Sequence, residues 1–195
     1  MQNKPNKITM DKSTDYSKYK AALQKIADIK YASAVLQWDQ ETYLPKNGNE
    51  ARGRQIATLN ELAHEQFTDS KFGDLMTELL ITNKLNIYER RNVTLSLEDY
   101  HKSKKLPSSF VRKMSETVNK SFHAWVQARR ENSFIIFEKP LQQIIELKKQ
   151  EADLIGYENH PYNALMNDYD KGLTTTIVDK LFADLLPQLS TILKK

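Results

Sequence analysis

Apolar residues recur every three or four positions along almost the whole chain, and this periodicity constrains the fold more than any other feature. The first such pattern runs from about Tyr16 to Trp38, and the last runs from about Thr174 to Leu193. This spacing gathers apolar side chains on one face of an α-helix. Alternation typical of strands is hard to find, and the 195 residues include only five glycines. The sequence therefore predicts an all-α protein.

Prolines, turn formers and capping residues divide the pattern into eight expected helices. Pro140 lies inside the sixth, where its missing N–H predicts a kink or a restart. Gly156 stands where a glycine would end that helix, and Thr176 with Asp179 has the spacing of a capping box at the start of the last. The expected ranges are 16–44, 50–67, 70–80, 86–105, 108–128, 133–155, 162–169 and 174–193.

Composition and charge exclude several classes of protein. Residues 1–15 are polar and have no apolar core, so we expect a disordered tail that is neither a secretory signal nor a membrane span. The 29 basic and 25 acidic residues leave a net charge of +4 spread along the chain. Nucleic-acid binding needs basic residues gathered on one face, so no nucleic-acid partner is expected. The absence of cysteine suits a reducing compartment, and we expect a cytoplasmic protein.

The last helical pattern is among the most apolar in the chain. It ends at Lys194-Lys195 with no capping glycine, and Pro187 inside it predicts a bend. An apolar stripe this broad requires partners on more than one side. We therefore expect residues 16–195 to be the helical part of a larger protein, truncated at the C-terminal end. In the complete protein we expect the missing part to cover this helix, and in the chain alone we expect the helix to mediate self-association or to pack on a partner.

One short stretch concentrates polar and aromatic groups at the end of the first helix. It carries Trp38, Asp39, Gln40, Thr42 and Tyr43, and Pro45 ends it because a proline ring disfavours helical geometry in the residue before it. The simpler interpretation is a helix end with its indole in the core. The functional interpretation is a helix end that presents hydrogen-bonding groups to a cleft. Sequence pattern alone leaves both open.

Pairs of glutamate and histidine raise the question of a metal site. Glu61 with His64 and Glu98 with His101 have the Glu-x-x-His spacing of di-iron bundles. On helical wheels, however, these side chains flank or leave the apolar stripes, which favours solvated positions. His64-Glu65 begins like the zinc-peptidase motif, but Thr68 stands where the second histidine is needed. We expect no metal ligands and no catalytic residues in this chain.

Short segments that follow one another along the chain match the pattern of a known family. These segments are Leu36-Gln37-Trp38-Asp39-Gln40-Glu41-Thr42 with Pro45, Glu50-Ala51-Arg52, Gln55-Ile56-Ala57-Thr58-Leu59, Leu62-Ala63-His64-Glu65, Glu89-Arg90-Arg91-Asn92-Val93, Lys105-Leu106-Pro107, Ala124-Trp125-Val126-Gln127-Ala128-Arg129, Glu146-Leu147-Lys148, Gly156-Tyr157-Glu158, His160-Pro161-Tyr162 and Gly172-Leu173-Thr174. With these segments, the chain resembles the N-terminal portion of the thermostable carboxypeptidase (carboxypeptidase Taq) family of zinc metallocarboxypeptidases.

The resemblance implies a multi-helix wall and lid of a larger helical metallopeptidase fold. Family members are longer, and their His-Glu-x-x-His helix and other zinc ligands lie beyond residue 195. The complete protein is then expected to bind zinc or a similar divalent metal, to form dimers and to release C-terminal residues from peptide substrates. Trp38, Asp39, Gln40, Thr42 and Tyr43 would line its substrate cleft. The alternative is a stand-alone helical module that serves as a binding or regulatory protein.

Overall fold

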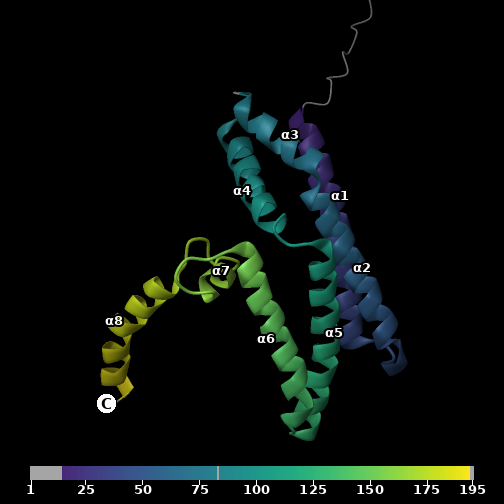
Figure 1. The fold of residues 1–195 in the computed structure, drawn as a ribbon, viewed down its shortest axis with the longest axis vertical. Coiled ribbons are helices and arrows are strands. Elements are labelled where there is room, and N and C mark those ends of the chain that lie inside the picture. The colour runs from purple at the N-terminus through teal and green to yellow at the C-terminus, as the bar shows by residue number, and fades with distance from the viewer. Residues whose placement is uncertain (1–14, 83, 194–195) are drawn as a thin grey trace, which may run out of the picture. The chain divides into compact units, whose positions relative to one another are not determined.

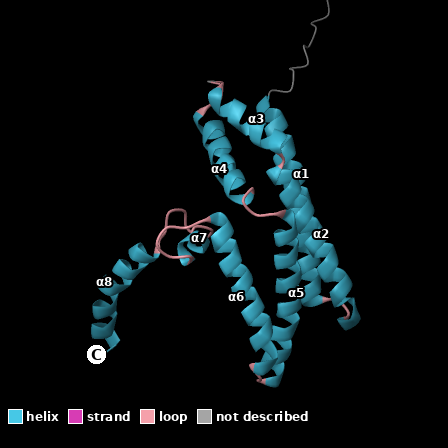
Figure 2. Ribbon diagram, viewed as in Figure 1, coloured by secondary structure: helices cyan, strands magenta, loops and turns pink. Residues whose placement is uncertain are grey.

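The computed structural model describes residues 15–82 and 84–193 (Figure 1). All regular structure in these two ranges is helical (Figure 2), which confirms the all-α prediction. The chain forms two compact units, Met1–Lys104 and Lys105–Lys195. The expected tail lies almost wholly outside the described residues. In the described ranges, no helix is both long and apolar enough to cross a membrane.

The described residues of the first unit form four α-helices and one short 3₁₀ turn. They are α1 (Asp15–Thr42), η1 (Lys46–Gly48), α2 (Asn49–Thr68), α3 (Ser70–Ile81) and α4 (Ile87–Ser103). The loop through η1 returns α2 along α1 (Figure 1). Side chains cap the N-termini of two helices. Asp69 accepts backbone hydrogen bonds at the start of α3, and Asn86 with Glu89 forms a capping box at the start of α4.

The core of the first unit joins α1, α3 and α4. Its buried members are Tyr19, Ile26, Phe72, Met76, Leu79, Val93 and Tyr100. The Tyr19 hydroxyl meets the Ser96 hydroxyl at 2.8 Å and donates to the Asn92 carbonyl at 3.2 Å, so this buried polar group is satisfied. Gly73 lets α3 approach Tyr100, because a Cβ at this position would lie 2.4 Å from the Cζ atom of the ring.

The apolar stripe of α1 is buried along only part of its length. Tyr19 and Ile26 are in the core, as the periodicity predicts. Tyr31, Val35 and Trp38 continue the same stripe but are exposed. The interpretation that places the Trp38 indole in the core is therefore wrong for this structure. The described helices that bury the N-terminal part of the α1 stripe leave the apolar side chains of its C-terminal part exposed.

The second unit contains α5 (Ser108–Glu131), α6 (Ile135–Ile155), α7 (Tyr162–Met166) and α8 (Thr175–Leu193). Helices α5 and α6 form an antiparallel hairpin. Its turn passes through Asn132, whose φ of 48° is left-handed. Helix α6 ends at Gly156, as predicted, with a φ of 83° that favours glycine. The Lys105 ammonium donates to the Ile155 carbonyl at 2.5 Å and so satisfies this helix end.

The structure decides two details of the helix boundaries. Helix α6 is continuous through Pro140, which excludes the predicted restart, and the kink stays a prediction. The expected capping box at Thr176 is wrong, because Thr176 lies inside α8. The Thr174 hydroxyl instead accepts a hydrogen bond from the Ile177 backbone at 3.3 Å. Two threonines precede Thr176 and offer equivalent hydroxyls, so the sequence pattern did not identify which one caps the helix.

Candidate functional site

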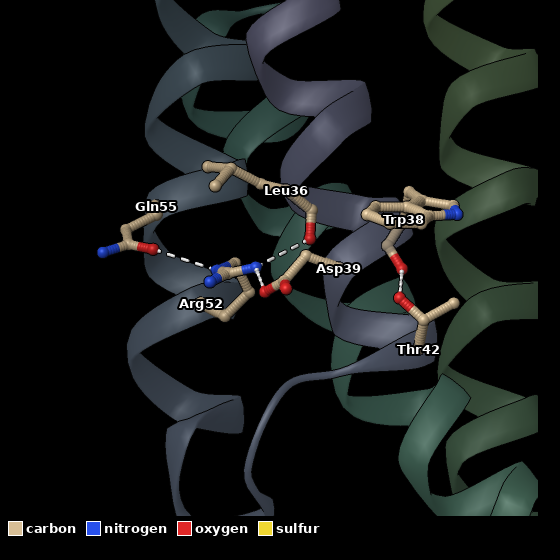
Figure 3. Close-up of polar contacts among 6 residues, drawn as sticks. All are labelled: Leu36, Trp38, Asp39, Thr42, Arg52 and Gln55. Atoms are coloured by element: carbon tan, nitrogen blue, oxygen red, sulfur yellow. Dashed lines mark hydrogen bonds and ion pairs between the residues drawn. The ribbon is translucent and has the colours of Figure 1, made fainter.

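The C-terminal end of α1 is held against α2 by an arginine. The Arg52 guanidinium donates to the Asp39 carboxylate at 2.5 Å, to the Leu36 carbonyl at 3.0 Å and, through Nε, to the Gln55 side-chain oxygen at 3.1 Å. Figure 3 shows Arg52 and Asp39 pointing toward each other between the two helices. Their side chains are 15% and 33% exposed. This partly buried, charge-assisted contact fixes the position of the end of α1 relative to α2.

Backbone hydrogen bonds complete this helix end. The amides of Tyr43 and Leu44 both donate to the Asp39 carbonyl, at 2.9 and 3.0 Å. The Thr42 hydroxyl donates to the Trp38 carbonyl at 2.7 Å, a local bond that leaves the hydroxyl oxygen able to accept. Asp39 therefore contributes to the helix end with both its side chain and its carbonyl.

Two aromatic rings stand exposed beside this anchored end. Trp38 is 58% exposed and Tyr43 is 74% exposed. Their ring centroids lie 5.5 Å apart in an edge-to-face arrangement that favours aromatic pairs. In Figure 3 the Trp38 indole points away from Arg52. Gln40 is half-buried on the same helix end. The structure thus brings the five predicted residues to one helix end and exposes the two rings.

Arg52 is the residue that reasoning from the predicted site missed. Its segment, Glu50-Ala51-Arg52, carries part of the family resemblance, but its pairing with Asp39 depends on how α2 returns along α1. The spacing of 13 residues across a loop does not predict such a contact.

The structure also places the histidine and glutamate pairs considered as metal ligands. Glu61 and His64 lie on α2, and Glu98 and His101 lie on α4. No group of three or more His, Cys, Asp or Glu side chains in residues 15–82 and 84–193 is arranged to hold a metal ion. A catalytic zinc needs three protein ligands and an open position. The described side chains do not fit such a metal.

Comparison with known proteins decides what this helical array belongs to. The family model described as carboxypeptidase Taq (M32) metallopeptidase matches residues 18–195. This chain belongs to the carboxypeptidase Taq (M32) family. The assignment confirms the resemblance that the ordered segments indicated, and it identifies the helical array as part of a larger helical fold.

Individual M32 relatives show how much of the fold the chain covers. Thermostable carboxypeptidase 1 of Pyrococcus furiosus is 35% identical over 175 residues, which are 90% of this chain and 35% of that protein. A solved structure named CHT is 47% identical, with a TM-score of 0.74 over 92% of this chain and 36% of that one. The crystal structure of BsuCP is 29% identical, with a TM-score of 0.85 over 88% and 35%. The chain spans about a third of the length of these relatives.

Proposed function

We propose that this chain is the N-terminal, non-catalytic part of a metal-dependent carboxypeptidase that releases C-terminal residues from peptides. Membership of the M32 family over residues 18–195, at about 35% of the length of a relative, supports this role. The described residues offer no metal-binding cluster, so the metal, which we propose to be zinc, and the reacting groups belong to the other part of the fold. In this proposal residues 16–195 form a helical wall and lid, and the complete protein is a cytoplasmic dimer.

We further propose that the end of α1 lines the peptide cleft of the complete protein. The observation that carries this proposal is the pair of exposed rings, Trp38 and Tyr43, on a helix end that Arg52 anchors. Exposed aromatic rings offer apolar area at a small cost in side-chain entropy. Gln40 and Thr42 supply hydrogen-bonding groups beside them. Asp39 acts through Arg52, by holding this end in position.

The test is a truncation of an exposed ring in the complete protein. Trp38→Ala should lower kcat/KM for peptide hydrolysis by about tenfold, since a loosely placed substrate reacts slowly. The melting temperature should change little, because the ring is mostly exposed. Tyr31→Ala, also exposed on α1, is the matched control and should leave kcat/KM unchanged. Equal kcat/KM in Trp38→Ala and the unsubstituted protein would show that the end of α1 does not line the cleft.

Helix α8 supports a second proposal, self-association of this chain. None of its residues is buried, and one half of its circumference is apolar. Pro187 lies on the opposite, polar side of the helix. Large exposed apolar surfaces mark interaction sites. The same exposure favours a stand-alone binding module as the alternative function. The exposed apolar residues are Ile177, Leu181, Phe182, Leu185, Leu186, Leu189, Ile192 and Leu193.

A further inference from the structure

The loop between α1 and α2 contains the one Asn-Gly dipeptide of the sequence, Asn47-Gly48. We propose that Asn47 is a site of spontaneous deamidation and that the η1 turn sets its rate. This chemistry is independent of the proposed peptidase role. It would convert an uncharged residue beside the anchored end of α1 into a carboxylate.

The reaction uses only the chain and water. The Gly48 backbone nitrogen gives up its proton and attacks the side-chain carbonyl carbon of Asn47, forming a new carbon–nitrogen bond. The bond from that carbon to the side-chain amide nitrogen breaks, and this nitrogen takes up a proton and leaves as ammonia. Water then opens the cyclic imide at either carbonyl. One opening gives aspartate, and the other gives isoaspartate, in which the main chain runs through the side-chain carbon. Glycine at position 48 favours the attack because no Cβ shields its nitrogen.

The structure exposes Asn47 and restrains the dipeptide. Asn47 is exposed to water. The Gly48 amide, however, donates to the Pro45 carbonyl at 2.8 Å, and Asn47 lies inside the 3₁₀ turn. A helical backbone at Asn47 directs the Gly48 nitrogen away from the asparagine side chain. The attack therefore requires the turn to open. A single short turn at the surface opens more readily than a packed helix.

The nearest competitor in the described chain is Asn132, which precedes Ser133. Asn132 is exposed and already has a positive φ of 48°. The Ser133 amide donates to the Ala128 carbonyl at 2.9 Å, within the capping structure of α5. Serine also carries a Cβ that hinders its nitrogen. Asn47 should consequently react before Asn132.

The two products affect the first unit differently. Aspartate at position 47 places a negative charge just before α2, where the helix dipole favours it. Isoaspartate adds a methylene to the main chain between Pro45 and Gly48, so the hydrogen bond that closes η1 no longer spans the same number of atoms. The loop between α1 and α2 would then lengthen, although the ion pair of Asp39 with Arg52 holds these two helices together.

The test incubates the folded full chain at mildly alkaline pH and follows deamidation by peptide mapping with mass spectrometry. Asn47 should be converted before Asn132, with isoaspartate among the products, and conversion should be faster in urea. Gly48→Ala should slow conversion at Asn47 by about tenfold, because the added methyl group hinders the attack. This Cβ would lie 2.9 Å from the flexible Leu44 Cδ1 atom, so the fold should survive, as circular dichroism would verify. Asn47→Gln should remove the modified peptide.

Three results would overturn the proposal. Conversion of Asn132 ahead of Asn47 in the folded chain would show that Asn47 is not the preferred site. An undiminished rate in folded Gly48→Ala would show that attack by the Gly48 nitrogen is not the route. A rate in urea no faster than in the folded chain would show that η1 exerts no control.

Discussion

At the scale of single residues, the ion pair between Asp39 and Arg52 differs from the exposed ion pairs common on the surfaces of helices. Both side chains are largely shielded from water, and the guanidinium makes two further hydrogen bonds. A double-mutant cycle with Asp39→Asn and Arg52→Gln should give a coupling free energy of about 1 kcal/mol in urea unfolding.

The matched control for this cycle lies two residues further along α2. Arg54 and Glu50 also pair, at 2.9 Å, but their side chains are 59% and 85% exposed. Exposed pairs of this kind couple by about 0.3–0.5 kcal/mol. Equal coupling in the two cycles would mean that Arg52 does not anchor the end of α1.

The sign of the stability change in Gly73→Ala distinguishes helix propensity from steric overlap with Tyr100. Helix propensity alone favours alanine over glycine in the middle of α3 by about 0.5–1 kcal/mol. A Cβ at this position would instead press on the ring of Tyr100, which is buried and has little room to move. We expect Gly73→Ala to lower the free energy of unfolding by about 1–3 kcal/mol. Asp74→Ala, at an exposed position of the same helix, is the control, and a more stable Gly73→Ala variant would contradict the packing.

His123 on α5 makes stability depend on pH. Among the described residues its buried Nε2 atom has no hydrogen-bond partner, and burial lowers the pKa of this imidazole below its ordinary value of 6.5. Below pH 6.5 the unfolded chain therefore binds a proton that the folded chain does not. Stability contributed by the neutral imidazole is present above pH 6.5 and decreases as the pH falls toward the folded pKa.

Replacing this imidazole tests the linkage. His123→Leu should reduce the loss of unfolding free energy between neutral pH and about pH 5, measured by urea unfolding across that range. His101→Leu, at an exposed position, controls for the removal of one histidine. An unchanged pH profile in His123→Leu would show that His123 is not responsible.

At the scale of elements, periodicity predicted the helices well because it depends on local sequence. Pro107 predicted the start of α5 and Gly156 predicted the end of α6, because the backbone preferences of proline and glycine act within a residue or two. The exposed half of the α1 stripe did not follow, because burial depends on what other helices cover. The contact of Arg52 with Asp39 was missed for the same reason, although both residues carried the family resemblance.

Helix α8 carries the prediction of self-association. Covering a few hundred Å² of apolar surface stabilises an interface by several kcal/mol at about 25 cal/mol per Å², before ordering costs. The sedimentation coefficient should therefore rise with protein concentration. Leu185→Glu should abolish this rise, whereas Asp179→Lys, on the polar side of α8, should preserve it. A strict monomer at every concentration would contradict the proposal.

At the scale of the whole molecule, we propose that this chain is the N-terminal part of an M32 carboxypeptidase. The family match from residue 18 onward and the coverage of about a third of each relative support the claim. In the proposed complete fold, the other part supplies the metal and also covers the apolar surface of α8. A stand-alone module would use the same helices without either contribution.

The most direct test is the intact mass of the protein purified from its native source, measured by mass spectrometry. If the chain is part of a longer carboxypeptidase, we expect a species well above 22.7 kDa, the mass of these 195 residues, that contains their peptides. A native species of 22.7 kDa would contradict it and favour the stand-alone binding module.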